Sequence, residues 1–176
     1  MDVQLKVGDV LQVAADVLIS TANPWLNLSG GVNGAVHSIC PQIQEELHTY
    51  LKEAGKSAVP GGTVVQTSAR ELPFQHVLHA VAIDPFYDSS PELVAETLCT
   101  ALKMASLLNA RTVSMPTLAT GYGPLSIKDF ATAMAESKIQ EFDLETLFVV
   151  VRNEENASVI RGVLDAKQTC SPKIPG

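Results

Sequence analysis

The stretch over residues 16–37 constrains the fold more than any other part of the chain. It begins with a short apolar run at 17–19, which is typical of a buried strand. A loop with Gly30 and Gly31 follows, and from Val32 the apolar residues take a helical spacing. Such a junction gathers free backbone N–H groups and the positive end of a helix, which suits an anion such as a pyrophosphate. An ordinary turn between a strand and a helix explains the loop as well, since a lone glycine pair is weak support for a site.

The same arrangement occurs a second time. A short strand is predicted at 112–115, a glycine-bearing loop follows at 116–124, and Ser126 with Asp129 forms a helix start signal. Further strands are predicted at 2–7, 17–20, 63–67, 76–83 and 147–151, with extended chain at 11–13. A first helix is expected over 32–54, with a break near Cys40 that is caused by Pro41. Three further helices are expected after the capping residues Ser90, Ser126 and Asn153. The helix after Ser126 is expected to reach Ile139.

Strands alternate with helices through most of the chain. This pattern predicts an α/β sheet with helices on both faces and parallel strands at its centre. The N-terminal strand and the two strands around Pro73 are the candidates for antiparallel pairing. A single domain is expected over 1–168, followed by a flexible tail over 169–176. Because ligands of open α/β sheets bind at the carboxyl ends of the strands, the two loops are predicted to clasp a diphosphate from both sides.

The charge of the chain narrows the class of partner. The formal net charge is −7 and the pI is about 5.0, which argues against a general nucleic-acid binder. Three cysteines lie scattered without metal-like or paired spacing, so we expect reduced thiols, no metal and an intracellular, cytoplasmic protein. The first ten residues lack the apolar segment of a signal peptide, and no stretch is long enough to span a membrane.

The chain resembles the macro domain family over about residues 3–165. The motifs that carry this resemblance are Gly-Asp-Val at 8–10, Ser-Thr-Ala-Asn at 20–23, Gly-Gly-Val-Asn-Gly-Ala-Val-His at 30–37, Leu-Pro at 72–73, Val-Leu-His at 77–79 and the loop at 116–123. Macro domains bind ADP-ribose, its polymers or related nucleotides, and some members hydrolyse ADP-ribosyl groups or O-acetyl-ADP-ribose. The resemblance implies a three-layer α/β/α fold with a mixed central sheet, ADP-ribose as ligand without any cofactor, and ADP-ribosylated macromolecules as partners.

The resemblance also implies roles for individual residues. Asp9 would accept a hydrogen bond from the adenine amino group, the Val10 N–H would donate to the adenine ring, and Asn23 would hydrogen-bond the distal ribose. The first loop would line the diphosphate and the distal ribose through Gly30, Gly31 and Val32. The second loop would hold the diphosphate from the other side through Ala119, Thr120, Gly121, Tyr122 and Gly123.

Four departures from the family pattern concern the site and its surroundings. Asn33 stands where hydrolytic members often carry Asp, and an amide cannot act as a general base. Arg152 stands where Phe or Tyr often stacks on adenine, a role that a guanidinium can also fill. The second loop is one residue shorter than usual before Tyr122. Trp25 replaces part of a glycine-rich run and is expected to be a packing residue.

Three functional hypotheses follow. The favoured one is a non-catalytic module that binds ADP-ribose or an ADP-ribosyl group. The second is an ADP-ribosyl hydrolase or O-acetyl-ADP-ribose deacetylase, in which Asn23 and Asn33 are the catalytic candidates and the substrate phosphate replaces the missing carboxylate. The third is a macro-like fold that binds another nucleotide or an RNA end, or that has lost its ligand.

Overall fold

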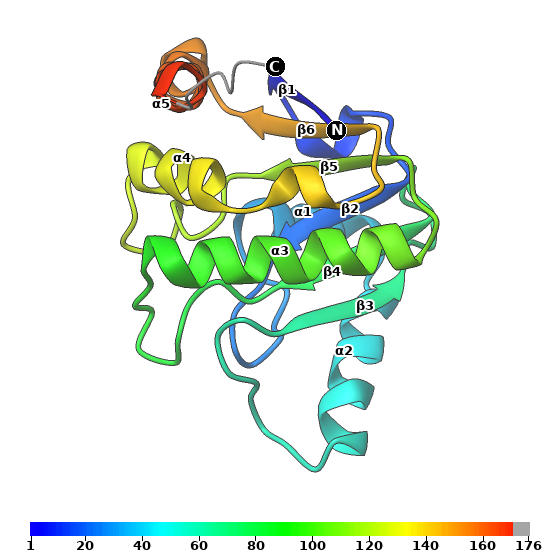
Figure 1. Ribbon diagram of the computed structural model, residues 1–176. Helices are drawn as coiled ribbons and strands as arrows, with labels where there is room; N and C mark the ends of the chain where they lie inside the picture. The colour runs from blue at the N-terminus through cyan, green and yellow to red at the C-terminus, as the bar shows by residue number, and fades with distance from the viewer. Residues whose placement is uncertain (171–176) are drawn as a thin grey trace.

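The computed structural model describes residues 1–170, and within this range a six-stranded sheet carries helices on both faces (Figure 1). The strands are β1 (Asp2–Val7), β2 (Val17–Thr21), β3 (Val64–Ser68), β4 (His76–Ala80), β5 (Thr112–Pro116) and β6 (Thr146–Val151). The α-helices are α1 (Gly31–Ile39), α2 (Gln42–Glu53), α3 (Pro91–Leu107), α4 (Ile127–Glu136) and α5 (Glu154–Cys170). Two short 3₁₀ helices are η1 (Val10–Gln12) and η2 (Ile139–Glu141).

The strand order is β1-β6-β5-β2-β4-β3. Neighbouring strands run parallel except for β3 and β4, which pair antiparallel around the turn at Pro73. The predicted mixed sheet and this antiparallel pair are therefore confirmed. The antiparallel pairing expected for the N-terminal strand is wrong, because β5 and β6 lie between β1 and β2 and β1 pairs parallel with β6.

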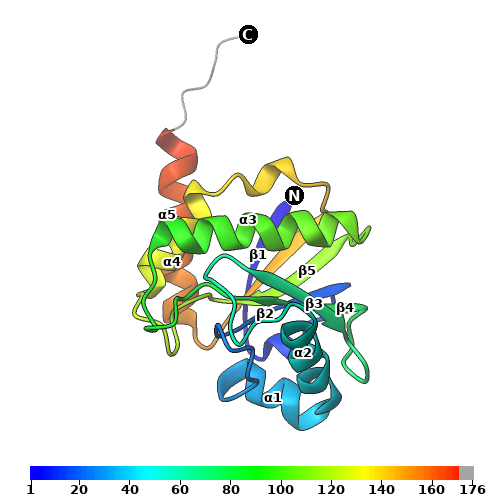
Figure 2. The ribbon, with the colours of Figure 1, turned by 90° about the horizontal axis from the view of Figure 1, so that it is seen from below.

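The sheet separates two hydrophobic cores, and Figure 2 shows α3, α4 and α5 on one side of it and α1 and α2 on the other. The apolar run of β2 serves both cores because successive side chains of a strand point to opposite faces. Val17 and Ile19 pack in the first core, and Leu18 packs in the second. A continuous apolar run is thus explained by a strand that is covered on both faces. The predicted three-layer α/β/α architecture is confirmed.

Most helix ends lie where the sequence predicts them. The chain leaves helical geometry at Cys40, so Pro41 divides the expected long helix into α1 and α2. Ser126 and Asp129 form a complete capping box at the start of α4, and the Asn153 side chain accepts a hydrogen bond from the Asn156 N–H at the start of α5.

Four local predictions need correction. Leu11 and Gln12 belong to the 3₁₀ turn η1, which the Asp9 carboxylate caps, and of the residues predicted as extended chain only Val13 is extended. The helix expected to reach Ile139 ends at Glu136, and Ile139 belongs to η2. β4 ends at Ala80, three residues before the predicted end, where the chain turns into the loop that precedes α3. α5 continues to Cys170, and the rest of the predicted tail lies outside the described residues.

Candidate functional site

A cleft of about 760 Å³ lies at the carboxyl ends of the parallel strands. The strand order places its lining residues in a row along the sheet edge. Asp9 and Arg152, which follow β1 and β6, lie at one end, the loop after β5 comes next, and Asn23 follows β2. Tyr87, from the loop after β4, lies at the other end. The site is therefore an elongated groove with two distinct ends.

The structure brings all the sequence-predicted site residues together on this cleft. They are Asp9, Val10, Asn23, Gly30, Gly31, Val32, Asn33, Ala119, Thr120, Gly121, Tyr122, Gly123 and Arg152. Their roles in binding or catalysis remain predictions. In the described part of the chain no group of three or more His, Cys, Asp or Glu side chains is arranged to hold a metal ion, and no helix is long and apolar enough to cross a membrane.

The first loop delivers an uncapped helix N-terminus to the cleft. Gly30 and Gly31 have φ values of 63° and 52°, in the left-handed region of backbone conformation that residues other than glycine rarely adopt. No side chain caps α1, so the first N–H groups of this helix have no intrahelical or side-chain acceptor. Because Gly31, Val32 and Asn33 also line the cleft, these donors and the positive end of the helix lie beside it.

The second loop closes against the first. A Cβ atom at Gly30 would overlap with the phenol of Tyr122, so the Tyr122 ring lies directly against the first loop. A Cβ atom at Gly123 would overlap with the carbonyl group of Ala119, whose own φ is 57°. The second loop therefore brings Tyr122 to the glycine-bearing first loop through a tight turn between Ala119 and Gly123.

Asn33 offers the cleft a donor. The side chain is buried, and its Oδ1 atom accepts a hydrogen bond of 2.7 Å from the Ser20 hydroxyl on β2. Because the carbonyl end of the amide is held in this way, the Nδ2 group is what remains for a ligand. At this position the protein presents a neutral hydrogen-bond donor, which cannot accept a proton from water.

Asn23 organises its own loop. Its Oδ1 atom accepts hydrogen bonds from the backbone N–H groups of Trp25 (3.1 Å) and Asn27 (3.2 Å), and its Nδ2 group donates to the Asn27 carbonyl (2.9 Å). These three bonds fix the side chain against the loop that follows β2. One N–H of the amide stays available to a ligand, so any contact from this side chain is made from a rigid position.

The two charged side chains that line the cleft within the described range are Asp9 and Arg152. Asp9 is exposed, and its Oδ1 atom accepts a hydrogen bond of 2.9 Å from the Leu11 N–H, which leaves Oδ2 for a ligand. Arg152 is exposed and forms no ion pair within residues 1–170. No histidine of that range lines the cleft, so a general base is absent from the end that contains Asn23 and Asn33.

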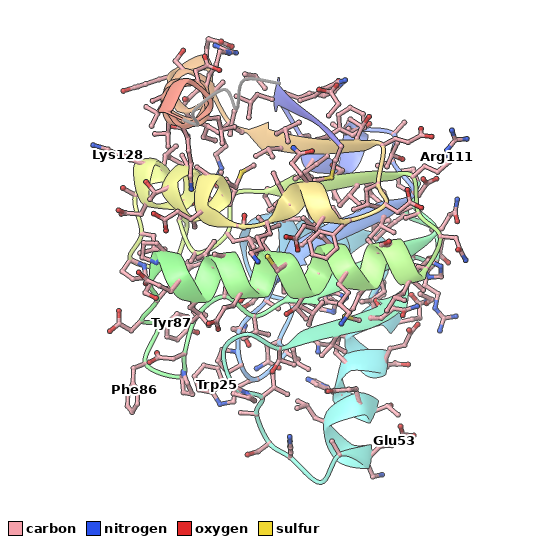
Figure 3. The ribbon with its side chains drawn as sticks, viewed as in Figure 1. Trp25, Glu53, Phe86, Tyr87, Arg111 and Lys128 are labelled. Atoms are coloured by element: carbon pink, nitrogen blue, oxygen red, sulfur yellow. The ribbon has the colours of Figure 1, made fainter. Side chains whose placement is uncertain are left out.

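Tyr87 is a lining residue that the sequence analysis missed. It has a left-handed φ of 61°, and its ring packs against Trp25 with ring centroids 6.0 Å apart (Figure 3). Trp25 is therefore a packing residue, as expected from the sequence. The signal that could have identified Tyr87 is the aromatic pair Phe86-Tyr87 in the middle of a loop, where a turn next to Pro85 would ordinarily carry polar side chains.

Comparison with known proteins agrees with this geometry. The model of the family described as "Macro domain" matches residues 19–134. The chain belongs to the Macro domain family. An O-acetyl-ADP-ribose deacetylase of Enterobacter sp. (strain 638) is 33% identical over 173 residues, which cover 92% of this chain and 93% of the relative.

Solved macrodomains share the fold. The Oceanobacillus iheyensis macrodomain with ADP matches with a TM-score of 0.84 and 26% identity, over 94% of this chain and 90% of that one. The Trypanosoma brucei macrodomain in complex with ADP-ribose matches with a TM-score of 0.76 and 22% identity, over 91% of this chain and 68% of that one. At 22% identity, the similarity to the Trypanosoma brucei structure shows a shared fold and nothing more.

Proposed function

We propose that this macro domain binds ADP-ribose, free or attached to a macromolecule, as a recognition module. The observation that carries the proposal is the cleft itself, in which an uncapped helix N-terminus faces a second glycine-bearing loop. The Oceanobacillus iheyensis relative, whose structure was solved with ADP, supports a nucleoside diphosphate as the ligand.

In this proposal the adenine occupies the end of the cleft next to β1 and β6. The Asp9 carboxylate accepts from the adenine amino group through Oδ2, because Oδ1 is already bonded to the Leu11 N–H. The Val10 N–H donates to the adenine ring. Arg152, which has no carboxylate partner in residues 1–170, is able to stack its guanidinium plane on the base.

The diphosphate lies between the two loops. Backbone N–H groups at the start of α1 donate to it from one side, and those of the loop at 119–123 donate from the other. Neutral donors of this kind explain how a chain with a net charge of −7 holds a doubly negative group. The distal ribose then lies beside Asn23 and Asn33, within reach of the amide N–H groups that the protein leaves unused.

Calorimetric titration with ADP-ribose and with AMP tests this assignment. ADP-ribose is expected to bind with measurable affinity and AMP far more weakly, because AMP lacks the second phosphate and the distal ribose. Equal affinities for the two ligands would show that the two loops do not form the binding site.

A second function, O-acetyl-ADP-ribose deacetylation or ADP-ribosyl hydrolysis, is favoured by the named activity of the 33%-identical Enterobacter relative. The carboxylate that lines the cleft, Asp9, follows β1, whereas Asn23 follows β2 and Asn33 is bonded to Ser20 on β2, so that β6 and β5 lie between them. Turnover would then depend on the substrate phosphate and on a water molecule held by Asn23. We therefore infer that binding is the main function and that any hydrolysis is slow.

A further inference from the structure

The turn at residues 84–88 presents an aromatic surface at the Tyr87 end of the cleft. Phe86 is 90% exposed at the tip of this turn and projects away from the body of the protein (Figure 3). Tyr87 lines the cleft on the inner side of the turn, and Trp25 packs against its ring. We call these three side chains the aromatic rim. Phe86 lies outside the cleft and is not used by the proposed ADP-ribose site.

Hydrogen bonds of its own hold the turn in its conformation. The Asp84 side chain accepts hydrogen bonds from the backbone N–H groups of Phe86 (2.8 Å) and Asp88 (2.9 Å). The Asp84 N–H donates in turn to the Asp88 carbonyl (2.8 Å), and the Ser89 hydroxyl donates to the Ala82 carbonyl (2.6 Å). An exposed aromatic ring on a pre-ordered turn loses little conformational entropy on binding, which is the property of a contact surface.

The position of the rim relates it to one part of the ligand. Asp9 and Arg152 lie at the far end of the strand row, and the diphosphate loops lie between them and the rim. A ligand with its adenine beside Asp9 therefore directs its distal ribose towards Asn23 and the rim. Whatever group is attached to that ribose leaves the cleft next to Tyr87 and Phe86.

The charges near the aromatic rim favour one kind of group at this end of the cleft. No Lys or Arg occurs in the sequence between Arg70 and Lys103, whereas Asp84, Asp88 and Glu92 all lie in the segment that carries Phe86 and Tyr87 of the rim. Aromatic faces attract cations, and guanidinium groups also stack on them. Carboxylates beside the rings reinforce that attraction. They would repel a second ADP-ribose unit, because its diphosphate is negatively charged.

We propose that the aromatic rim binds the basic polypeptide segment to which the ADP-ribosyl group is attached. Lysine or arginine side chains next to the modified residue pack on Phe86 and lie near the carboxylates of Asp84 and Asp88. The inference rests on the proposed ADP-ribose site and adds a substrate class to it. The module then prefers mono-ADP-ribosylated basic proteins to free ADP-ribose and to its polymer.

Titration calorimetry at low and physiological salt tests this preference. The probes are ADP-ribose, a linear ADP-ribose trimer, and two ten-residue peptides with one ADP-ribosylated serine, flanked by Lys and Arg in one peptide and by Glu in the other. The basic peptide is expected to bind about three- to tenfold more tightly than ADP-ribose, since a cation–π contact and nearby carboxylates contribute at that level. The advantage is expected to shrink with salt.

Variants connect the preference to the rim. Phe86→Ala and Asp88→Lys are expected to abolish the advantage of the basic peptide and to leave the affinity for ADP-ribose unchanged. Leu107→Ala is the matched control, because this 73% exposed apolar side chain lies at the opposite end of α3. Circular dichroism is expected to show that all three variants fold.

The outcomes separate the two proposals. Failure of ADP-ribose itself to bind would overturn the proposed function and this inference with it. Binding of ADP-ribose with equal affinity for both peptides would overturn the inference alone. Tightest binding of the trimer would overturn it in favour of a polymer-binding rim, and an unchanged preference in Phe86→Ala would show that the ring takes no part.

Discussion

Single side chains on the cleft determine what it can do to a bound ligand. The Asn33 amide is oriented by the buried Ser20 hydroxyl, so the geometry for a hydrogen-bonded group at this position is already built. A carboxylate in the same place could accept the Ser20 hydrogen bond with one oxygen and face the cleft with the other. If the proposed lack of a general base is correct, exchange of the Asn33 amide for a carboxylate supplies that base without any rearrangement of the surrounding fold.

Asn33→Asp is expected to raise turnover of an ADP-ribosylated substrate by about 10²–10⁴-fold, the usual contribution of a positioned general base. Single-turnover assays of the native chain, of Asn33→Asp and of Asn33→Ala would measure this. Asn33→Ala is expected to gain no activity over the native chain, because it too lacks the carboxylate. Fast turnover by the native chain that is lost in Asn23→Ala would contradict the binding-module assignment.

Asp9 carries the adenine contact of the proposed site. Asp9→Ala is expected to lower ADP-ribose affinity on the order of tenfold to a hundredfold, because a hydrogen bond to a charged group contributes roughly 1.5–3 kcal/mol. The exposed Asp165 on α5 provides a control with the same charge change, and Asp165→Ala is expected to bind normally. Calorimetry on both variants distinguishes a local contact from a general effect of charge.

The buried His79 makes the stability of the protein dependent on pH. Burial lowers the pKa of His79 from 6.5 to about 4, and its Nδ1 atom has no hydrogen-bond partner among residues 1–170. The unfolded chain binds a proton at this residue below about pH 6.5, whereas the folded protein does so only near pH 4, so the free energy of unfolding falls as the pH decreases between these values. The total loss is about 3 kcal/mol.

Urea unfolding at pH 7, 5.5 and 4.5 would measure this loss. In His79→Gln the fall in the free energy of unfolding between about pH 6.5 and pH 4 that His79 causes is expected to disappear. This expectation holds whatever the stability of the variant at pH 7. An unchanged slope in His79→Gln would show that other groups cause the acid sensitivity.

At the scale of elements, the two loops are in contact through the Tyr122 ring, which lies against Gly30, and the second loop is itself held in a tight turn by the close approach of Gly123 to Ala119. Gly123→Ala is expected to destabilise the protein by about 1–3 kcal/mol and to weaken ADP-ribose binding, since the added Cβ overlaps with the Ala119 backbone and cannot be relieved by a side-chain movement. Gly121→Ala is the control, because a Cβ there meets nothing within 4 Å. Thermal unfolding of Gly123→Ala and Gly121→Ala measures the difference in stability. Equal melting temperatures of the two variants would contradict the prediction.

The same scale shows why some elements were predictable and others were not. Pro41 and the Ser126–Asp129 box act through local backbone chemistry, so the break between α1 and α2 and the start of α4 follow from the sequence. The direction of β1 depends on which strands lie between it and β2, a long-range choice that its alternating residues do not encode. Tyr87 was missed for a similar reason, since only the strand order brings its turn to the cleft.

For the whole molecule, the site at the carboxyl ends of the strands depends on the strands keeping their positions in the sheet, and contacts at the amino ends of the strands contribute to this. Asp16 does this at the amino ends of the central strands, far from the aromatic rim, where Figure 3 shows the neighbouring Arg111. Its carboxylate accepts hydrogen bonds from the Arg111 N–H (2.8 Å), the Thr112 N–H (2.9 Å) and the Gln75 side chain (3.1 Å). The residue before β2 is thereby tied to the residues before β4 and β5.

Asp16→Ala is therefore expected to lower the free energy of unfolding by roughly 1.5–3 kcal/mol, the contribution of hydrogen bonds to a charged group. Burial alone would raise the pKa of Asp16, but the hydrogen bonds from Arg111 and Thr112 outweigh it and lower the pKa below 3.8. Its contribution to stability is present above that pH and is lost as the pH falls further. Urea unfolding at pH 7 measures the change, and Asp143→Ala, at an exposed position, is the control.

The ADP-ribose affinity of the folded Asp16→Ala protein is expected to stay within about twofold of the native value, because distant sites that share no partners act independently. A large loss of affinity with intact folding would instead show that the amino-terminal edge of the sheet adjusts the cleft.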